Sequence, residues 1–139
     1  MAAGDELVGD LGLTSARWQV LGAIELAPYP LPVAHIAFNM GLSRQAVQRI
    51  AKELASCGMI DFADNPRHVR AKLVITTAKG KQAFASAMKR QKPWATRLGA
   101  RLKLIEIETA VRVMRNIRQR LETSESTKGR PDHESQEHA

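Results

Sequence analysis

The sequence predicts a mainly α fold with one small β-hairpin (α+β), and three observations lead to this prediction. Apolar residues recur every three or four positions over residues 14–27, 43–57 and most of 77–121, as they do in amphipathic helices. Two short runs with strand character flank an Asn-Pro pair that favours a turn. At 139 residues the chain is long enough to bury one core, so a single domain with long C-terminal helices is expected.

The first predicted elements are three helices separated by a proline-rich segment and a turn. Residues 14–27 start at a Thr-Ser pair that can cap a helix, and residues 28–32 hold three prolines that prevent this helix from continuing. Residues 33–39 make a short second helix, which Met-Gly ends. Ser43 then caps a third helix over about 43–57. Two short helices joined by a glycine-containing turn are the helix-turn-helix pattern.

A β-hairpin is predicted directly after the third helix. Residues 59–64 (MIDFAD) alternate apolar with small or acidic side chains, and residues 71–77 (AKLVITT) are rich in β-branched residues. The tip between them, NPRHVR, carries Arg67 and Arg70. A hairpin with a basic tip after a helix-turn-helix gives the order of a winged helix-turn-helix.

Long helices are predicted for the C-terminal part of the chain. Thr77 or its neighbour caps this region, and Pro93 is expected to kink or interrupt it. Beyond Pro93 the apolar residues form two adjacent lines, a stripe too wide for a strict two-stranded coiled-coil seam. We therefore expect burial on two sides, by the chain itself and by a second copy. The predicted interface residues are Leu98, Leu102, Ile105, Ile107, Val111, Met114, Ile117 and Leu121.

Positive charge is concentrated in the middle of the chain. The net charge is +7, and residues 41–103 hold 14 Lys/Arg against 3 Asp/Glu. Residues 1–40 hold 1 Lys/Arg and 4 Asp/Glu, and the polar residues 122–139, expected to be a disordered tail, hold 2 and 5. A localised basic surface attracts polyanions, of which nucleic acid is the commonest in the cytoplasm. An anionic membrane surface would satisfy the same electrostatics.

Several classes of protein are not expected from this sequence. The single cysteine excludes an intrachain disulfide framework and a cysteine-rich zinc site. No apolar run reaches the roughly 18 residues of a transmembrane helix, and the acidic N-terminus lacks the pattern of a signal peptide, so a cytoplasmic protein without a membrane partner is expected. The chain has no HExxH, Walker or GxSxG motif and no Cys/His zinc spacing. We therefore expect no enzyme, no cofactor and no metal site.

The ordered set of motifs resembles the MarR family of bacterial and archaeal transcriptional regulators. The residues that support the resemblance span about 13–85, namely Leu42-Ser43, Val47-Gln48-Arg49, Leu54, Gly58-Met59-Ile60, Asn65-Pro66, Arg70 to Val74, and Thr77-Ala78-Lys79-Gly80. Three features depart from the family pattern. Asn65, His68 and Val69 replace two acids and an arginine of the family's wing, Ala46 replaces a frequent threonine, and the segment before Leu13 is short.

The resemblance implies a domain organisation and a function. Residues 1–12 would be an N-terminal lead-in and 13–85 a winged helix-turn-helix, with the recognition helix at about 43–57 and the wing at about 59–77. Residues 86–121 would form the helical dimerisation region. The implied function is that of a homodimeric repressor, which binds a pseudo-palindromic operator in double-stranded DNA and is released by a small aromatic or phenolic effector.

Specific residues are expected to serve this function. Arginine and glutamine can form paired hydrogen bonds with guanine and adenine edges in the major groove, while serine, lysine and wing arginines suit phosphates or the minor groove. The expected DNA contacts are Ser43, Arg44, Gln45, Gln48, Arg49, Lys52, Arg67, Arg70 and Lys72. Trp18, Tyr29, Phe38 and Trp94 could line an effector pocket, with ordinary core packing as the other interpretation. The alternative function is a protein–protein interaction module with only non-specific DNA affinity.

Overall fold

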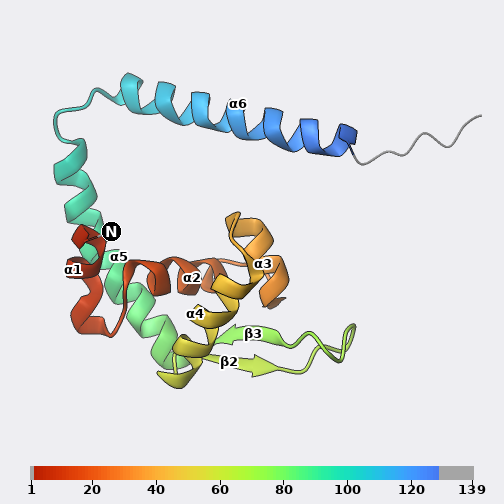
Figure 1. Ribbon diagram of the computed structural model, residues 1–139. Helices are drawn as coiled ribbons and strands as arrows, with labels where there is room; N and C mark the ends of the chain where they lie inside the picture. The colour runs from red at the N-terminus through yellow and green to blue at the C-terminus, as the bar shows by residue number, and fades with distance from the viewer. Residues whose placement is uncertain (1, 129–139) are drawn as a thin grey trace, which may run out of the picture. The chain divides into compact units, whose positions relative to one another are not determined.

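The computed structural model describes residues 2–128 and confirms the mainly α fold with a small antiparallel sheet (Figure 1). The chain divides after Arg97 into two compact units. In chain order the elements are α1 (Ala2–Val8), the 3-10 helix η1 (Gly9–Leu11), α2 (Ser15–Glu25), β1 (Leu31–Pro32), α3 (Val33–Met40), α4 (Arg44–Ser56), β2 (Ile60–Ala63), β3 (Leu73–Thr76), α5 (Ala78–Gly99) and α6 (Leu104–Lys128).

The helix-turn-helix is formed by α3 and α4, as predicted. Gly41 ends α3 with a φ of +65°, a left-handed conformation that costs glycine little. The hydroxyl oxygen of Ser43 then accepts a hydrogen bond from the Ala46 N–H at 3.2 Å, which caps α4. Thr14 caps α2 in the same way by accepting from the Arg17 N–H. The caps expected from the sequence therefore set where these helices begin.

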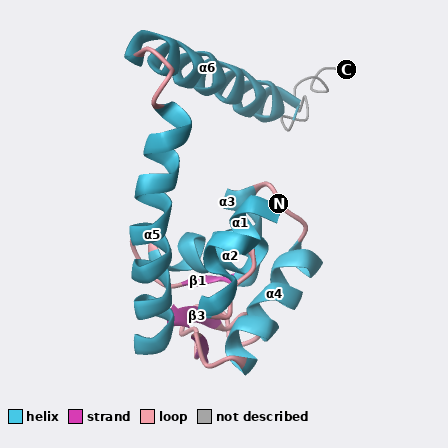
Figure 2. Ribbon diagram, turned by 90° about the vertical axis from the view of Figure 1, so that its left-hand side faces the viewer, coloured by secondary structure: helices cyan, strands magenta, loops and turns pink. Residues whose placement is uncertain are grey.

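The predicted hairpin is formed by β2 and β3, and a third strand joins it. The strand order is β1-β3-β2, with Phe62 paired to Val74 and Leu31 paired to the same valine from the other side. Figure 2 shows the small sheet beside the lower half of α5. β1 was not predicted, because the prolines around it indicate only the end of a helix. A proline is tolerated there because an edge strand does not need every N–H for pairing.

The core lies in the first unit, between α2, α3, α4 and the sheet. The largest side chains that are almost wholly buried are Leu21, Ile36, Leu54 and Ile60, each of which stabilises the fold by roughly 1.5–3 kcal/mol relative to an exposed position. On α4 the buried residues are Val47, Ile50, Ala51 and Leu54, which lie on one face of the helix. The opposite face of α4 is therefore left to solvent.

Residues 1–12, expected only as a lead-in, contribute α1 and η1 to this unit. Val8 is fully buried in the core. The Asp5 carboxylate accepts a hydrogen bond from the Ser15 N–H at the start of α2. Arg90 on α5 forms an ion pair with Asp10 and donates to the Leu7 carbonyl at 3.2 Å. This contribution to the core was not predicted, because a single buried valine produces no helical periodicity.

A junction of backbone contacts joins the end of α4, the hairpin and the start of α5. The Thr77 hydroxyl donates to the Gly58 carbonyl at 2.8 Å and accepts from the Gly80 N–H at 3.1 Å. The Thr77 N–H donates to the Met59 carbonyl at 3.1 Å. Lys79 donates to the carbonyl of Cys57, the C-cap of α4, at 2.6 Å. The Thr-x-x-Gly motif, residues 77–80, therefore supplies the contacts that α5 makes at this junction.

The C-terminal helices differ from the prediction in three places. α5 continues through Pro93, which is exposed, so that water can hydrate the carbonyl that proline leaves without a donor. The chain instead turns at residues 100–103, where the predicted interface residue Leu102 lies outside any helix. α6 begins after Lys103, whose N–H donates to the Glu106 carboxylate at 2.8 Å, the reciprocal contact of a capping box.

The helix α6 extends to Lys128, beyond the end predicted at residue 121. The predicted tail therefore starts too early, since residues 122–128 contain no glycine or proline that would stop a helix that has formed. Residues 129–139 of that predicted tail lie outside the described residues. Within the described part of the chain, no helix is both long enough and apolar enough to cross a bilayer.

Candidate nucleic-acid interface

The exposed face of α4 carries two parallel lines of polar side chains. Arg44, Gln48 and Lys52 are four residues apart and form the first line, because residues at this spacing lie one above the other on a helix. Gln45 and Arg49 form the second line beside it. The apolar face of the same helix is buried in the core, and the caps at both ends fix its rotation. All five polar residues are therefore presented outward by one rigid element.

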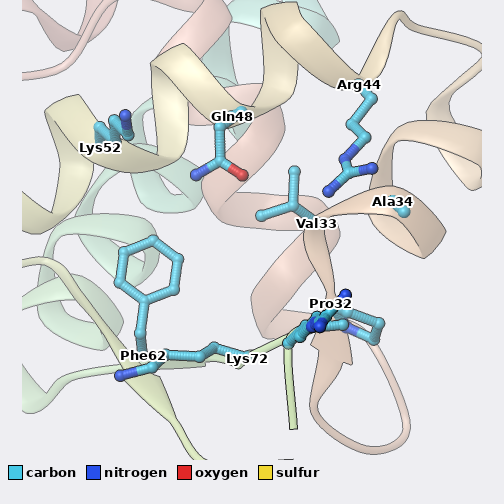
Figure 3. Close-up of a pocket in the computed structure, with 10 residues that line it drawn as sticks. Pro32, Val33, Ala34, Arg44, Gln48, Lys52, Phe62 and Lys72 are labelled. Atoms are coloured by element: carbon cyan, nitrogen blue, oxygen red, sulfur yellow. The ribbon is translucent and has the colours of Figure 1, made fainter. Parts of the chain in front are cut away.

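The first line borders an open groove of about 280 Å³ between α4, the start of α3 and the hairpin. Figure 3 shows Arg44 and Gln48 extending from α4 over Val33, with Phe62 rising toward Gln48 from the hairpin. The lining residues are Pro32, Val33, Ala34, Arg44, Gln48, Lys52, Phe62, Arg70, Ala71 and Lys72. Five of the nine predicted contact residues thus meet at one groove, although they come from two separate segments of the chain, 44–52 and 70–72.

The other four predicted residues lie outside the lining of this groove. Ser43 caps α4, and Gln45 is exposed on the neighbouring line. Arg49 donates to the carboxylate of Glu53 at 2.6 Å. Arg67 is exposed near the tip of the hairpin. The structure thus separates a groove set, Arg44, Gln48, Lys52, Arg70 and Lys72, from a peripheral set, Ser43, Gln45, Arg49 and Arg67.

Glu53, the only acid of α4, connects this helix to α2. Its carboxylate accepts from Arg17 at 3.0 Å on one oxygen and from Arg49 at 2.6 Å on the other. The hydrogen bond from Arg17, together with that from Arg49, holds the pKa of Glu53 below its ordinary value. The acid therefore has a structural role, and the groove-lining line of α4 contains no negative charge.

Replacing Glu53 by glutamine is expected to destabilise the protein near pH 7 and to have little effect in acid. A carboxylate with a lowered folded-state pKa stabilises the fold above its unfolded pKa, roughly 4.3, and this contribution is lost as the pH falls through the folded value. Urea unfolding of wild type and E53Q at pH 7 and at about pH 3 measures the difference. E6Q, at a position without a described ion pair, is the control. A gap that is the same at both pH values would contradict this role.

The tip of the hairpin is organised by the side chain of Asn65. This residue is only 9% exposed although it lies in a loop. Its amide nitrogen donates to the Ala71 carbonyl at 2.9 Å, and its amide oxygen accepts from the Arg67 N–H at 3.0 Å. The backbone adds bonds from the His68 N–H to the Asn65 carbonyl and from the Ala71 N–H to the His68 carbonyl. One neutral side chain thus closes the loop between the two strands.

Comparison with known proteins agrees with this geometry. Residues 11–71 match the MarR family. This segment, which holds α2, β1, α3, α4 and β2, is similar to that family. A protein of Mycobacterium tuberculosis, Rv2011c, is 32% identical over 88 residues, which cover 63% of this chain and 60% of that protein. The chain therefore spans about three fifths of the length of the curated relative that it matches.

Solved MarR-family structures have the same fold. The crystal structure of the MarR family transcription regulator SP03579 aligns with a TM-score of 0.76 at 18% identity, covering 93% of this chain and 83% of that one. CouR from Rhodococcus jostii RHA1, solved with p-coumaroyl-CoA bound, aligns with a TM-score of 0.70 at 22% identity, covering 86% and 81%. At these identities the likeness shows the fold.

The wing of this chain departs from the family pattern in its charge. Residues 65–105 contain 11 Lys/Arg and no Asp or Glu. Among the described residues, neither Arg67 nor Arg70 takes part in a salt bridge. Where the family pattern has an acid, the loop is thus held by the amide bonds of Asn65, and no described salt bridge neutralises the positive charge at the tip.

The four residues predicted for an effector pocket do not line the groove. Trp18 is half-buried and packs against the core. Tyr29 is 65% exposed in the loop after α2, and Phe38 is 84% exposed on α3. Trp94 is half-buried on α5. Core packing thus accounts for Trp18, whereas Tyr29 and Phe38 belong to the surface, and the effector pocket stays a prediction.

Two parts of the site were missed from the sequence. Pro32, Val33 and Ala34 form the floor of the groove beside α4, and Phe62 forms part of its wall. The alternation of the 59–64 run indicates that Phe62 faces the same side as Ile60, but no sequence signal shows that this side meets α4. The organising role of Asn65 was also missed, because its position in an Asn-Pro turn has a sufficient local explanation.

Proposed function

We propose that this chain is a homodimeric, sequence-specific DNA-binding transcriptional regulator that acts as a repressor on a pseudo-palindromic operator. The observation that supports this best is the groove, where α4 and the hairpin place five cationic or amide side chains around one concavity without an acid. Arg44 can donate two parallel hydrogen bonds to guanine, and Gln48 can pair with adenine. Lys52, Arg70 and Lys72 suit the phosphates that border such a contact.

The dimeric state is supported by the composition of α6. Within the described part of this helix, every large apolar side chain is at least 36% exposed, and the values reach 71% at Leu104. The apolar residues occupy about half of the helix circumference. Ile107, Val111 and Met114 lie along one line, and Ile117 and Leu121 lie along an adjacent line. A monomer rarely exposes so continuous an apolar surface, and a two-fold partner would cover it.

Release by a small aromatic or phenolic effector completes the proposal. Its support is the relative CouR, whose structure holds p-coumaroyl-CoA. The exposed aromatic side chains Tyr29 and Phe38 are available for such a ligand. Titration of the DNA complex with p-coumaroyl-CoA and with simple phenolic acids, read by loss of complex, tests this part by itself.

Selection from a pool of random duplexes at about physiological salt tests the main proposal. Enrichment of an inverted repeat, with half-site centres about 10 base pairs apart, is the expected result for a dimer with one recognition helix per half-site. No enrichment, together with binding that disappears as salt rises, would leave only the non-specific electrostatic component. That result would favour the alternative of a protein–protein interaction module.

Lys52→Ala is expected to weaken binding to all duplexes alike. A phosphate contact carries no sequence information, and its loss reduces the slope of log K against log salt by about 0.9. The measurement is a salt titration on the selected duplex and on an unrelated one. K89A, which removes an exposed lysine of α5 outside the groove, is the control. A loss confined to the selected duplex would assign Lys52 to base recognition instead.

A further inference from the structure

The loop of the hairpin contains a buried amide where the family pattern has an acid. Asn65 is the only buried residue of the segment 61–73, all of which the structure describes. Both ends of its amide are hydrogen bonded within the loop. A buried polar group that satisfies both its donor and its acceptor holds one conformation, since any other would leave one of them unpaired.

The two bonds of this amide act at the two ends of the tip. On one side the Arg67 N–H is held to the amide oxygen at 3.0 Å, and on the other side the Ala71 carbonyl is held to the amide nitrogen at 2.9 Å. One side chain therefore sets the backbone at Arg67 and at Ala71, the neighbour of Arg70. Arg70 also lines the groove, so the same amide connects the tip to the face of α4.

We propose that Asn65 is a positioning residue, which holds Arg67 and Arg70 in place for the minor groove and its phosphates beside the site read by α4. This inference rests on the proposed DNA-binding function and deepens it. An ion pair that orients an arginine also neutralises part of the arginine's charge, and the strength of the pair depends on salt. The amide of Asn65 orders the loop without a charge of its own, so both arginines keep their full attraction for DNA.

The consequence is a coupling between Asn65 and the two arginines. In the full-length protein, N65A is expected to reduce affinity for the selected duplex on the order of tenfold and to reduce the salt slope toward that of the double variant R67A/R70A. Adding N65A to R67A/R70A is expected to cause no further loss, since the residue acts only through the arginines. Q48A is the control, because its effect should add to that of N65A.

A second readout separates positioning from a simple loss of stability. An arginine held at a narrow minor groove prefers A-tract sequence, where the negative potential is enhanced. Wild type is therefore expected to bind duplexes with A-tract flanks more tightly than duplexes with G·C flanks, and N65A is expected to lose this preference. N65D keeps the acceptor for Arg67 but places an acceptor against the Ala71 carbonyl, so it should behave like N65A. Thermal unfolding of each variant confirms that the domain is folded.

The possible outcomes distinguish a failure of the positioning role of Asn65 from a failure of the proposed function. If wild type selects a duplex but N65A and R67A/R70A reduce its affinity additively, or N65A retains the flank preference, Asn65 does not position the wing and the proposed function stands. If wild type selects no duplex, the proposed function itself fails. If N65D binds as wild type does, the bond to Ala71 is not needed and the positioning role is rejected.

Discussion

The double variant R44A/Q48A is expected to lose specific binding to the selected duplex and to keep non-specific binding. Each paired hydrogen-bond contact to a base contributes about 1–3 kcal/mol of discrimination, so loss of both reduces specific affinity by roughly 2–6 kcal/mol where the two effects add. The non-specific component depends on the remaining cations and should change little. Competition between the selected duplex and an unrelated duplex measures the ratio directly.

The matched control for this variant is Q45A/R49A, on the second line of α4. Arg49 is held by Glu53, and neither residue lines the groove. A smaller loss is therefore expected from this pair than from R44A/Q48A. The opposite ranking would place the second line of α4 at the bases and would show that the groove is not the recognition surface.

Gly80→Ala is expected to be the most destabilising single substitution outside the apolar core. A Cβ at this position would lie 2.0 Å from the Met59 carbonyl oxygen and 2.8 Å from a methyl group of Thr76, so the backbone must move. Overpacking of this kind costs about 3 kcal/mol, and here it also disturbs the hydrogen bond that the Thr77 N–H donates to the Met59 carbonyl. Chemical denaturation of the purified variant measures the loss.

Gly99→Ala provides the comparison for this substitution. Gly99 is the last residue of α5, and no atom lies within 4 Å of a Cβ built there. Alanine is therefore expected to be neutral or to stabilise the helix by up to about 1 kcal/mol. Equal free energies of unfolding for wild type and G80A would show that the junction can relax and that the Thr-x-x-Gly motif does not need its glycine.

The sequence predicts those parts of the fold that depend on local physics. The caps at Thr14, Ser43 and Thr77 are found where they are expected, since a cap requires only a hydroxyl or amide residue three positions before an N–H of the first turn. Apolar alternation gives the face of β2 that holds Ile60 and Phe62, but β3 turns Val74 to that face and leaves Ile75 exposed, so alternation alone does not give the register of the pair. Pro93 shows the limit of such rules, because the cost of a proline depends on whether water reaches the carbonyl that it leaves free.

The candidate site could be predicted only in part for a related reason. The residues of α4 form a pattern along the chain, and their polar face can be recognised before folding. The floor of the groove at Pro32 to Ala34 depends on how α3 meets α4, which no spacing in the sequence encodes. Asn65 is similar, since its importance comes from burial at a loop tip, a property of the folded surface.

The junction around Thr77 couples the orientation of α5 to that of the elements that form the groove. The end of α4, the base of the hairpin and the first turn of α5 meet directly, because Thr77 donates to the carbonyls of both Gly58 and Met59. We therefore expect a change in the direction of the first turn of α5 to move the end of α4 and the base of the hairpin with it. Under the proposed function, a ligand that tilts α5 is therefore expected to change the orientation of α4 and the hairpin together.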